Sequence, residues 1–212
     1  MYKKWMLILI TGMLAVQIMG CGRTGSNGPT EVENGSAVDN TTADSDNIQN
    51  GTEAEMPEEE EDDTPVFFGD AELTCELPRG FRQYQDEEGM YVHKNYPSDL
   101  STISYVISES EEDITQMKQE EFADLLEADY YDAYGDVVEI HVIEYKNIQI
   151  DGRNGLRIKF EYEFKGVEYE QLMYAIYNGD ETHILNYTQE KGGKWMDAFE
   201  ESAASISLRP EG

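Results

Sequence analysis

Apolar residues are distributed unevenly along the chain and divide it into three parts. Residues 5–20 form a mostly apolar run, residues 22–66 contain hardly a large apolar side chain, and apolar positions recur with regular spacing from Phe67 onward. A segment so poor in apolar residues cannot bury enough surface to offset the entropy lost on ordering. The pattern therefore predicts an N-terminal leader, a disordered tether and one folded domain at residues 67–212.

Alternation with a period of two predicts several β-strands in this domain. It is clearest between Leu156 and Phe164, where apolar side chains alternate with charged ones. Leu73, Cys75 and Leu77 share one face of an earlier strand, so Cys75 is expected to be a small core residue. Strands are expected at residues 71–77, 91–96, 102–108, 137–145, 148–164, 167–177 and 183–187.

Two segments change to helical spacing. The first begins at Asp113, which can cap a helix with Gln116 three residues on, and ends at Gly135. Its apolar stripe consists of Ile114, Met117, Phe122, Leu125, Leu126 and Tyr130. The second places Trp195, Ala198, Phe199, Ser202 and Ile206 on one face. Two amphipathic helices are therefore expected, one in the middle of the domain and one near its end.

The order of these elements predicts the fold class. Three strands, a helix, four strands and a helix follow one another, with Lys165-Gly166 and Asn178-Gly179 as hairpin turns, since glycine and asparagine tolerate positive φ. We expect an α+β domain: a mainly antiparallel sheet of about six to seven strands flanked by two helices in an α/β/α sandwich.

The first 20 residues have the layout of a signal peptide, a short basic region followed by an apolar stretch. A membrane-spanning helix needs about 20 strongly apolar residues. This stretch is interrupted by Thr11, Gly12 and Gln17 and is not followed by a basic cluster. A cleaved leader is therefore the favoured interpretation.

The leader ends in Ile18-Met19-Gly20-Cys21, which resembles the lipobox of bacterial lipoproteins. In that resemblance Ile18 and Gly20 fit the branched and small positions, whereas Met19 stands where a small residue is usual. The resemblance implies cleavage before Cys21 and a diacylglycerol group on its thiol, whose thiolate is the nucleophile. The alternatives are a secretory signal cleaved elsewhere and an uncleaved anchor.

The folded domain resembles the PsbP-like group of α/β/α sandwiches. The resemblance rests on the order of elements, on the turn Leu77-Pro78-Arg79-Gly80-Phe81, and on Asp151–Gly155 before a long amphipathic strand. That group includes extrinsic photosystem-II subunits, a Ran-binding nuclear import factor and bacterial periplasmic or lipoprotein relatives of DcrB type. The resemblance implies a non-enzymatic binding or assembly role, although a fold does not by itself determine a function.

Charge excludes some partners. The net charge is −30, and residues 22–66 hold 13 acidic residues against Arg23 alone, so the tether and the domain are both acidic. Nucleic-acid binding is excluded, because it depends on lysine and arginine neutralising phosphates. An anionic membrane surface would also repel the domain. The expected link to the membrane is the lipid on Cys21.

No motif in the domain names a reaction, so no catalytic residue, metal or cofactor is expected. His93, His141 and His183 fall on three different strands with mixed faces, which favours ordinary core or surface histidines. An alternative remains open, in which these histidines and acidic residues converge in space. Such a site would make the protein an enzyme acting on envelope material or a small-ligand carrier.

A tyrosine cluster closes the first helix. Tyr130 continues the core stripe, whereas Tyr131 and Tyr134 are candidates for a partner surface, because tyrosine offers a large amphipathic contact. We expect a signal peptide at residues 1–20, a lipidated Cys21 opening an acidic tether at residues 21–66, and a binding domain at residues 67–212. The domain would meet an envelope protein at the extracytoplasmic face of the cell membrane of a Gram-positive bacterium. A lipoprotein that only spaces or buffers charge at the envelope is a further possibility.

Overall fold

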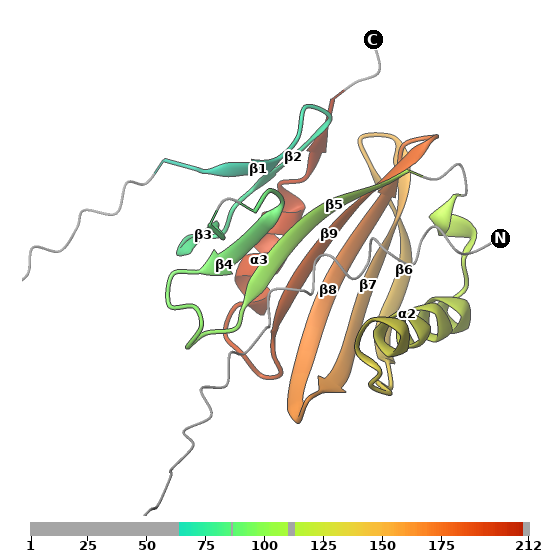
Figure 1. Ribbon diagram of the computed structural model, residues 1–212. Coiled ribbons are helices and arrows are strands. Elements are labelled where there is room, and N and C mark those ends of the chain that lie inside the picture. Colours follow the sequence, from blue (N-terminus) through green and yellow to red (C-terminus); the bar gives the residue numbers. More distant parts are fainter. Residues whose placement is uncertain (1–63, 86, 110–112, 210–212) are drawn as a thin grey trace, which may run out of the picture. The chain divides into compact units, whose positions relative to one another are not determined.

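The computed structural model describes residues 64–85, 87–109 and 113–209. Two sheets and two α-helices make up this part of the chain (Figure 1). The strands are β1 (Phe67–Gly69), β2 (Leu73–Glu76), β3 (Phe81–Gln83), β4 (Met90–His93), β5 (Thr102–Glu109), β6 (His141–Ile150), β7 (Arg153–Phe164), β8 (Val167–Tyr177), β9 (Glu181–Glu190) and β10 (Ser207–Leu208). The helices are the 3₁₀ turn η2 (Ile114–Gln116), α2 (Gln119–Tyr134) and α3 (Met196–Ala204).

The larger sheet has seven antiparallel strands in the order β3-β4-β5-β9-β8-β7-β6. The smaller sheet has the order β1-β2-β10. The expected α+β class, with a mainly antiparallel sheet and two helices, is confirmed. The division into two sheets was not predicted, because two strands of the smaller sheet, β1 and β10, are too short, at three and two residues, to show any alternation.

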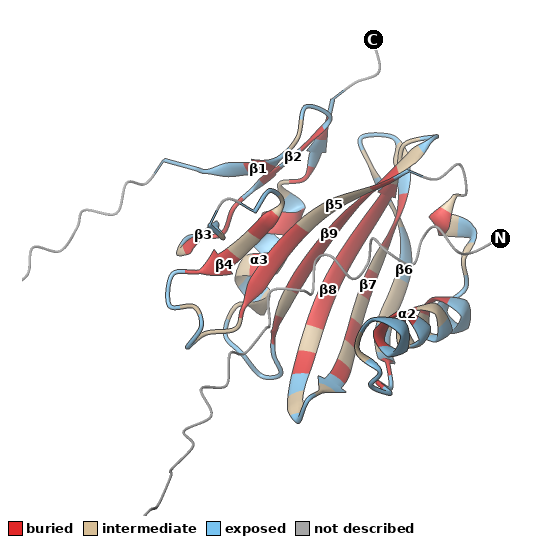
Figure 2. Cartoon of the chain, in the orientation of Figure 1, coloured by how far each residue is buried: buried red, intermediate tan, exposed pale blue. Residues whose placement is uncertain are grey.

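Side chains of β8 alternate between two cores, one on each face of the large sheet. Met173 and Ala175 belong to the core that includes α2 and η2. Leu172, Tyr174 and Ile176 belong to the core that includes α3, β2 and β10. The two helices therefore cover opposite faces, which makes the sandwich. Figure 2 shows the buried residues concentrated on the central strands β5, β9 and β8.

Several predicted boundaries are wrong, beginning with the start of the first helix. Asp113 does cap a helical segment, accepting from the Thr115 backbone at 2.9 Å, but that segment is η2. Met117 and Lys118 are extended, so α2 begins only at Gln119, and it ends at Gly135 as predicted.

Strand boundaries are also wrong: β4 ends at His93 and not at residue 96, and β6 begins at His141 and not at residue 137. The turn between β6 and β7 is misplaced as well. A break was expected between residues 145 and 148, but β6 continues to Ile150. The turn lies at Asp151 and Gly152, which have φ values of 48° and 83°. Such positive φ values are typical of a tight hairpin turn.

Candidate functional site

The residues of the predicted lipobox, Ile18, Met19, Gly20 and Cys21, lie outside the described residues. The two tyrosines proposed as a partner surface lie at the end of α2. Tyr131 is 58% exposed. Tyr134 is partly buried, and its ring centroid lies 4.9 Å from that of Phe164. Tyr130 is buried in the core as expected. A contact surface here would therefore be centred on Tyr131.

The three histidines do not meet in space. His141 is exposed on the edge strand β6, with β7 and β8 between it and β9. The His93 backbone bonds to Ser101, whereas His183 pairs with Ile107 further along β5. This register separates His93 and His183 by about 20 Å along the strand direction. Each of the two buried histidines is therefore the centre of its own cluster.

In the His93 cluster, the imidazole Nδ1 accepts from the Asn95 backbone N–H at 3.4 Å and also faces the Asp99 carboxylate. His93 Nδ1 lies 3.1 Å from Asp99 Oδ2, and the Trp195 indole N–H donates to the same oxygen at 2.9 Å. The rings of Trp195 and Phe81 lie 4.6 and 5.6 Å from the imidazole. Burial lowers the pKa of His93, and Asp99 opposes this only in part. These contacts describe a packed, neutral histidine.

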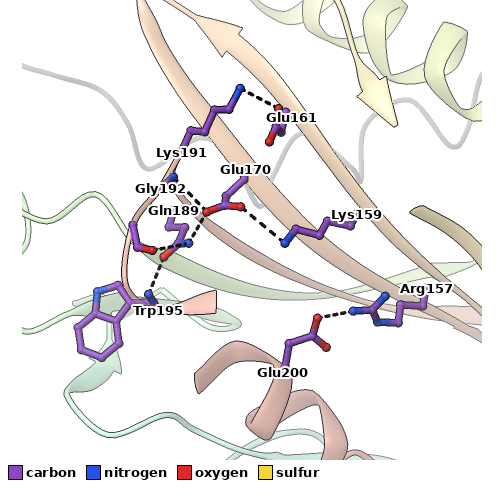
Figure 3. Close-up of polar contacts among 10 residues, drawn as sticks. Arg157, Lys159, Glu161, Glu170, Gln189, Lys191, Gly192, Trp195 and Glu200 are labelled. Carbon is purple, nitrogen blue, oxygen red and sulfur yellow. Dashed lines mark hydrogen bonds and ion pairs between the residues drawn. The ribbon is translucent and has the colours of Figure 1, made fainter. Parts of the chain in front are cut away.

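A network of charged and amide side chains holds Trp195 in place (Figure 3). The Trp195 backbone N–H donates to Gln189 Oε1 at 2.8 Å, and Gln189 Nε2 donates to Glu170 at 2.6 Å. Lys159 pairs with Glu170 at 3.7 Å, on the same face of β7 and β8. These charges position the loop before α3, and we assign them a structural role.

The His183 cluster contains a buried polar atom that has no hydrogen-bond partner among the described residues. The His183 side chain is fully buried, and its Nδ1 lies 2.7 Å from the Tyr105 hydroxyl. Its Nε2 lies 3.2 Å from Glu181 Oε1 and 4.0 Å from Glu72 Oε2. The geometry with Glu181 makes no hydrogen bond, so Nε2 is without one in the described part of the chain. An unpartnered buried polar atom costs free energy of about 1–3 kcal/mol.

The turn between β1 and β2 brings Glu72 to this histidine. Gly69 has a φ of 118°, and a Cβ there would lie 2.1 Å from the Leu73 carbonyl oxygen, so only glycine fits. Asp70 Oδ1 accepts the backbone N–H groups of Glu72 and Leu73, each at 2.7 Å. The turn between β8 and β9 contributes Asn178, which donates to Glu72 Oε2 at 2.7 Å. Two separate turns thus position one carboxylate.

Asp70 and Tyr105 determine how His183 is oriented. Burial alone would raise the pKa of Asp70, but hydrogen bonds from the Leu73 backbone and the Tyr105 hydroxyl bring it below its usual value. Burial and the Asp70 carboxylate raise the pKa of Tyr105 far above its usual value. Tyr105 therefore donates to an ionised Asp70 and accepts from His183 Nδ1–H. This arrangement leaves the lone pair of Nε2 facing two carboxylates.

An open pocket of about 750 Å³ adjoins this cluster, with Asp70 and Tyr105 in its wall. Glu87 and Glu88 add further carboxylates to its lining. An acidic wall of this kind favours a cation or a cationic group.

One sign of the cluster was present in the sequence. Glu181 and His183 are two apart on one strand, so their side chains share a face. Glu72 gives no such sign, since its place beside β9 depends on the tertiary fold.

Comparisons with known proteins bear on the fold alone. No protein-family model matches the sequence, and no curated protein matches it. Among solved structures, cyanobacterial PsbP from Synechocystis gives a TM-score of 0.53 at 12% identity, covering 68% of this chain and 92% of its own. LpqN of Mycobacterium tuberculosis, described as involved in cell envelope biogenesis, gives 0.48 at 15% identity, covering 69% and 90%. No helix in the described ranges is long and apolar enough to cross a membrane. The similarity to cyanobacterial PsbP establishes that the domain has a PsbP-like α+β fold.

Proposed function

We propose that this chain is a lipid-anchored extracytoplasmic lipoprotein of a Gram-positive bacterium. Its PsbP-like domain binds or helps to assemble a protein partner at the outer face of the cell membrane. The observation that carries the proposal is the sequence order: an apolar leader, Ile18-Met19-Gly20-Cys21, an acidic tether, and then a folded domain. Two acyl chains on one cysteine would anchor the protein stably where one would not.

The tether and the charge favour a protein partner. The composition predicts a tether of about 45 residues, and a flexible chain of that length would span roughly 35–40 Å and let the domain reach a neighbouring protein. The acidic domain would be repelled by anionic lipid and by nucleic acid. Tyr131, exposed at the end of α2, is the proposed centre of the contact, with Tyr134 beside it.

A non-catalytic role is supported by the His93 cluster, whose imidazole, carboxylate and indole bind one another. It is also what the PsbP-like resemblance implies. The alternative of an envelope-acting enzyme or small-ligand carrier is favoured by one observation, the gathering of Glu72, Glu181 and His183, next to which Asp70 and Tyr105 line an acidic pocket.

The two cysteines of the chain allow a matched test of the anchor. In a bacterium that processes lipoproteins, the wild type should incorporate a clickable fatty acid and fractionate with membranes. Cys21→Ser should lose the label completely, because the thiolate is the acylated nucleophile. Cys75 is buried, with Sγ 3.0 Å from the Ser202 carbonyl oxygen, and Cys75→Ser should keep the label. Labelling that survives Cys21→Ser would contradict the anchor.

A second test concerns the partner. Crosslinking in intact cells, followed by mass spectrometry, should capture one reproducible envelope protein. Tyr131→Ser should reduce that capture by about 10-fold, as expected for an aromatic hot spot. Phe67→Ser is the matched control, since Phe67 is a comparably exposed aromatic residue in β1. Equal capture by both variants would show that Tyr131 is not part of the contact.

A further inference from the structure

Within the described residues, a single group of three side chains combines the ligand types and spacing of a metal site. Glu72, Glu181 and His183 each offer one ligand atom, and these atoms all lie within 4.8 Å of one another. Exposed carboxylates often cluster without binding anything, so the acidic pair alone carries no conclusion. The informative member is His183.

His183 is fully buried, yet Nε2 has no hydrogen-bond partner in the described part of the chain. Buried polar atoms are nearly always satisfied, and an exception needs a physical reason. Nδ1 is held by Tyr105 and, behind it, Asp70. In a typical metal-binding histidine, one ring nitrogen is held by a hydrogen bond to a neighbouring group and the other binds the metal. Here Nδ1 is the held nitrogen and Nε2 is the one that can bind.

The distances suit a small divalent ion. Zn²⁺ binds imidazole nitrogen at about 2.0–2.1 Å and carboxylate oxygen at about 2.0–2.2 Å, so tetrahedral ligand atoms lie about 3.3 Å apart. Glu181 Oε1 is 3.2 Å from His183 Nε2, and Glu72 Oε2 is 4.0 Å away. The Glu72 side chain is 55% exposed and can approach further by rotating. Three protein ligands leave a fourth position open.

We infer that Glu72, Glu181 and His183 bind one Zn²⁺ ion. The nitrogen donor favours a transition metal over Ca²⁺ or Mg²⁺, which prefer oxygen ligands alone. The ion offsets the repulsion between the two carboxylates and satisfies Nε2. It also links the β1–β2 turn of the small sheet to β9 of the large sheet. This inference does not depend on the lipid anchor.

Titration calorimetry of the purified full chain with Zn²⁺ alone, at about pH 7.5, tests the inference. We expect saturation at one ion per chain and a thermal unfolding midpoint that rises by a few degrees with Zn²⁺. Glu72→Gln and His183→Gln should each weaken binding at least 10-fold. Tyr105→Phe should weaken it by about 10-fold, because it loosens the orientation of the imidazole. Ca²⁺ should not compete.

His141→Gln is the matched control, because His141 is an exposed histidine with a carboxylate oxygen of Glu139 3.9 Å away, and it belongs to no three-ligand group among the described residues. It should bind Zn²⁺ as the wild type does. Since Glu72 is exposed, Glu72→Gln keeps the test valid even if His183→Gln fails to fold. Three results would overturn the inference: no saturable binding, binding retained by Glu72→Gln, or an equal loss in His141→Gln. Zn²⁺ retained by every variant, as the acidic run at residues 58–63 would produce, would also overturn it.

Discussion

Two buried histidines lie on the same face of one sheet and have opposite surroundings. His93 is enclosed by Phe81 and Trp195, and Asp99 lies beside its ring nitrogen. His183 is at least as buried, but its Nε2 faces two carboxylates and has no hydrogen bond within the ranges that the structure describes. Burial therefore does not by itself separate a packing histidine from a ligand. What separates them is that the recorded polar contacts of His93 lie within its own cluster, whereas Nε2 of His183 is a buried atom without a hydrogen-bond partner among the described residues.

The largest expected loss of stability comes from disrupting the His93 cluster. Trp195→Ala removes the ring contacts with His93 and Phe81 and the hydrogen bond to Asp99. It should lower the free energy of unfolding by about 3 kcal/mol. Urea titration should be followed by circular dichroism, because Trp195 is the only tryptophan of the domain.

Lys194→Ala is the control for that variant. Its ammonium lies 4.7 Å from the Trp195 ring centroid, and its loss should cost less than about 1 kcal/mol. Stabilisation by Zn²⁺ should be unchanged in both variants, because the His183 cluster remains intact. If Trp195→Ala lowers the free energy of unfolding no more than Lys194→Ala does, the ring packing around His93 does not stabilise the domain.

The next largest effect on stability concerns a buried carboxylate that, unlike His183, belongs to no candidate metal site in the described ranges. Asp129 on α2 is buried, and neither carboxylate oxygen has a partner in the described residues. Burial, and then the charge of Asp132, raise the pKa of Asp129 to about 6. The folded state thus favours the protonated acid, and a penalty for ionised Asp129 develops as pH rises from about 4 to 6 and is complete above 6.

Asp129→Asn should therefore stabilise the protein by about 1–2 kcal/mol at about pH 8 and by little at about pH 4. Urea denaturation at the two pH values measures the difference. Asp132→Asn is the control and should give a smaller gain, because it removes only the neighbouring charge. A gain from Asp129→Asn that is equal at both pH values would contradict the raised pKa.

A smaller loss of stability is expected from a substitution in the His183 cluster when no metal is present. His183→Gln loses the hydrogen bond with Tyr105 but also removes the unpartnered imidazole nitrogen, so we expect a loss of about 1 kcal/mol. His93→Gln should cost about 2 kcal/mol, because Asp99 then loses a buried partner. Chemical denaturation in a chelator compares the two. Equal losses would remove the distinction between the clusters.

The smallest effect is expected on the surface. His141→Gln on β6 should change the free energy of unfolding by less than about 0.5 kcal/mol, with or without Zn²⁺. Thermal unfolding with and without a chelator measures this. A metal-dependent change would move the candidate site to the edge strand.

Prediction from the sequence succeeded where the signal is local. The alternation from Leu156 to Phe164 predicted β7, and Gly135 predicted the end of α2. The same reasoning misplaced the start of α2, because Met117 and Lys118 are extended and the Met117 carbonyl accepts from the Tyr145 hydroxyl of β6. Local signals therefore recover the elements better than their boundaries.

The His183 cluster shows what local signals miss. Two of its side chains, Glu181 and His183, share a face by simple period, yet a Glu-x-His pair is too common to indicate a site. Glu72 comes from the small sheet, and it is held by Asn178, 106 residues away in sequence. The unpartnered nitrogen that makes the cluster informative becomes visible only when the whole fold surrounds it.

The difference between the His183 and His93 clusters is tested most directly by anomalous diffraction from crystals grown with Zn²⁺. One strong zinc peak should lie next to His183 Nε2, with Glu72 and Glu181 as ligands, and His93 should remain bound to Asp99 without metal. Zinc found only at His141 or along acidic surface residues, with none at His183, would contradict the proposal that Glu72, Glu181 and His183 bind the ion.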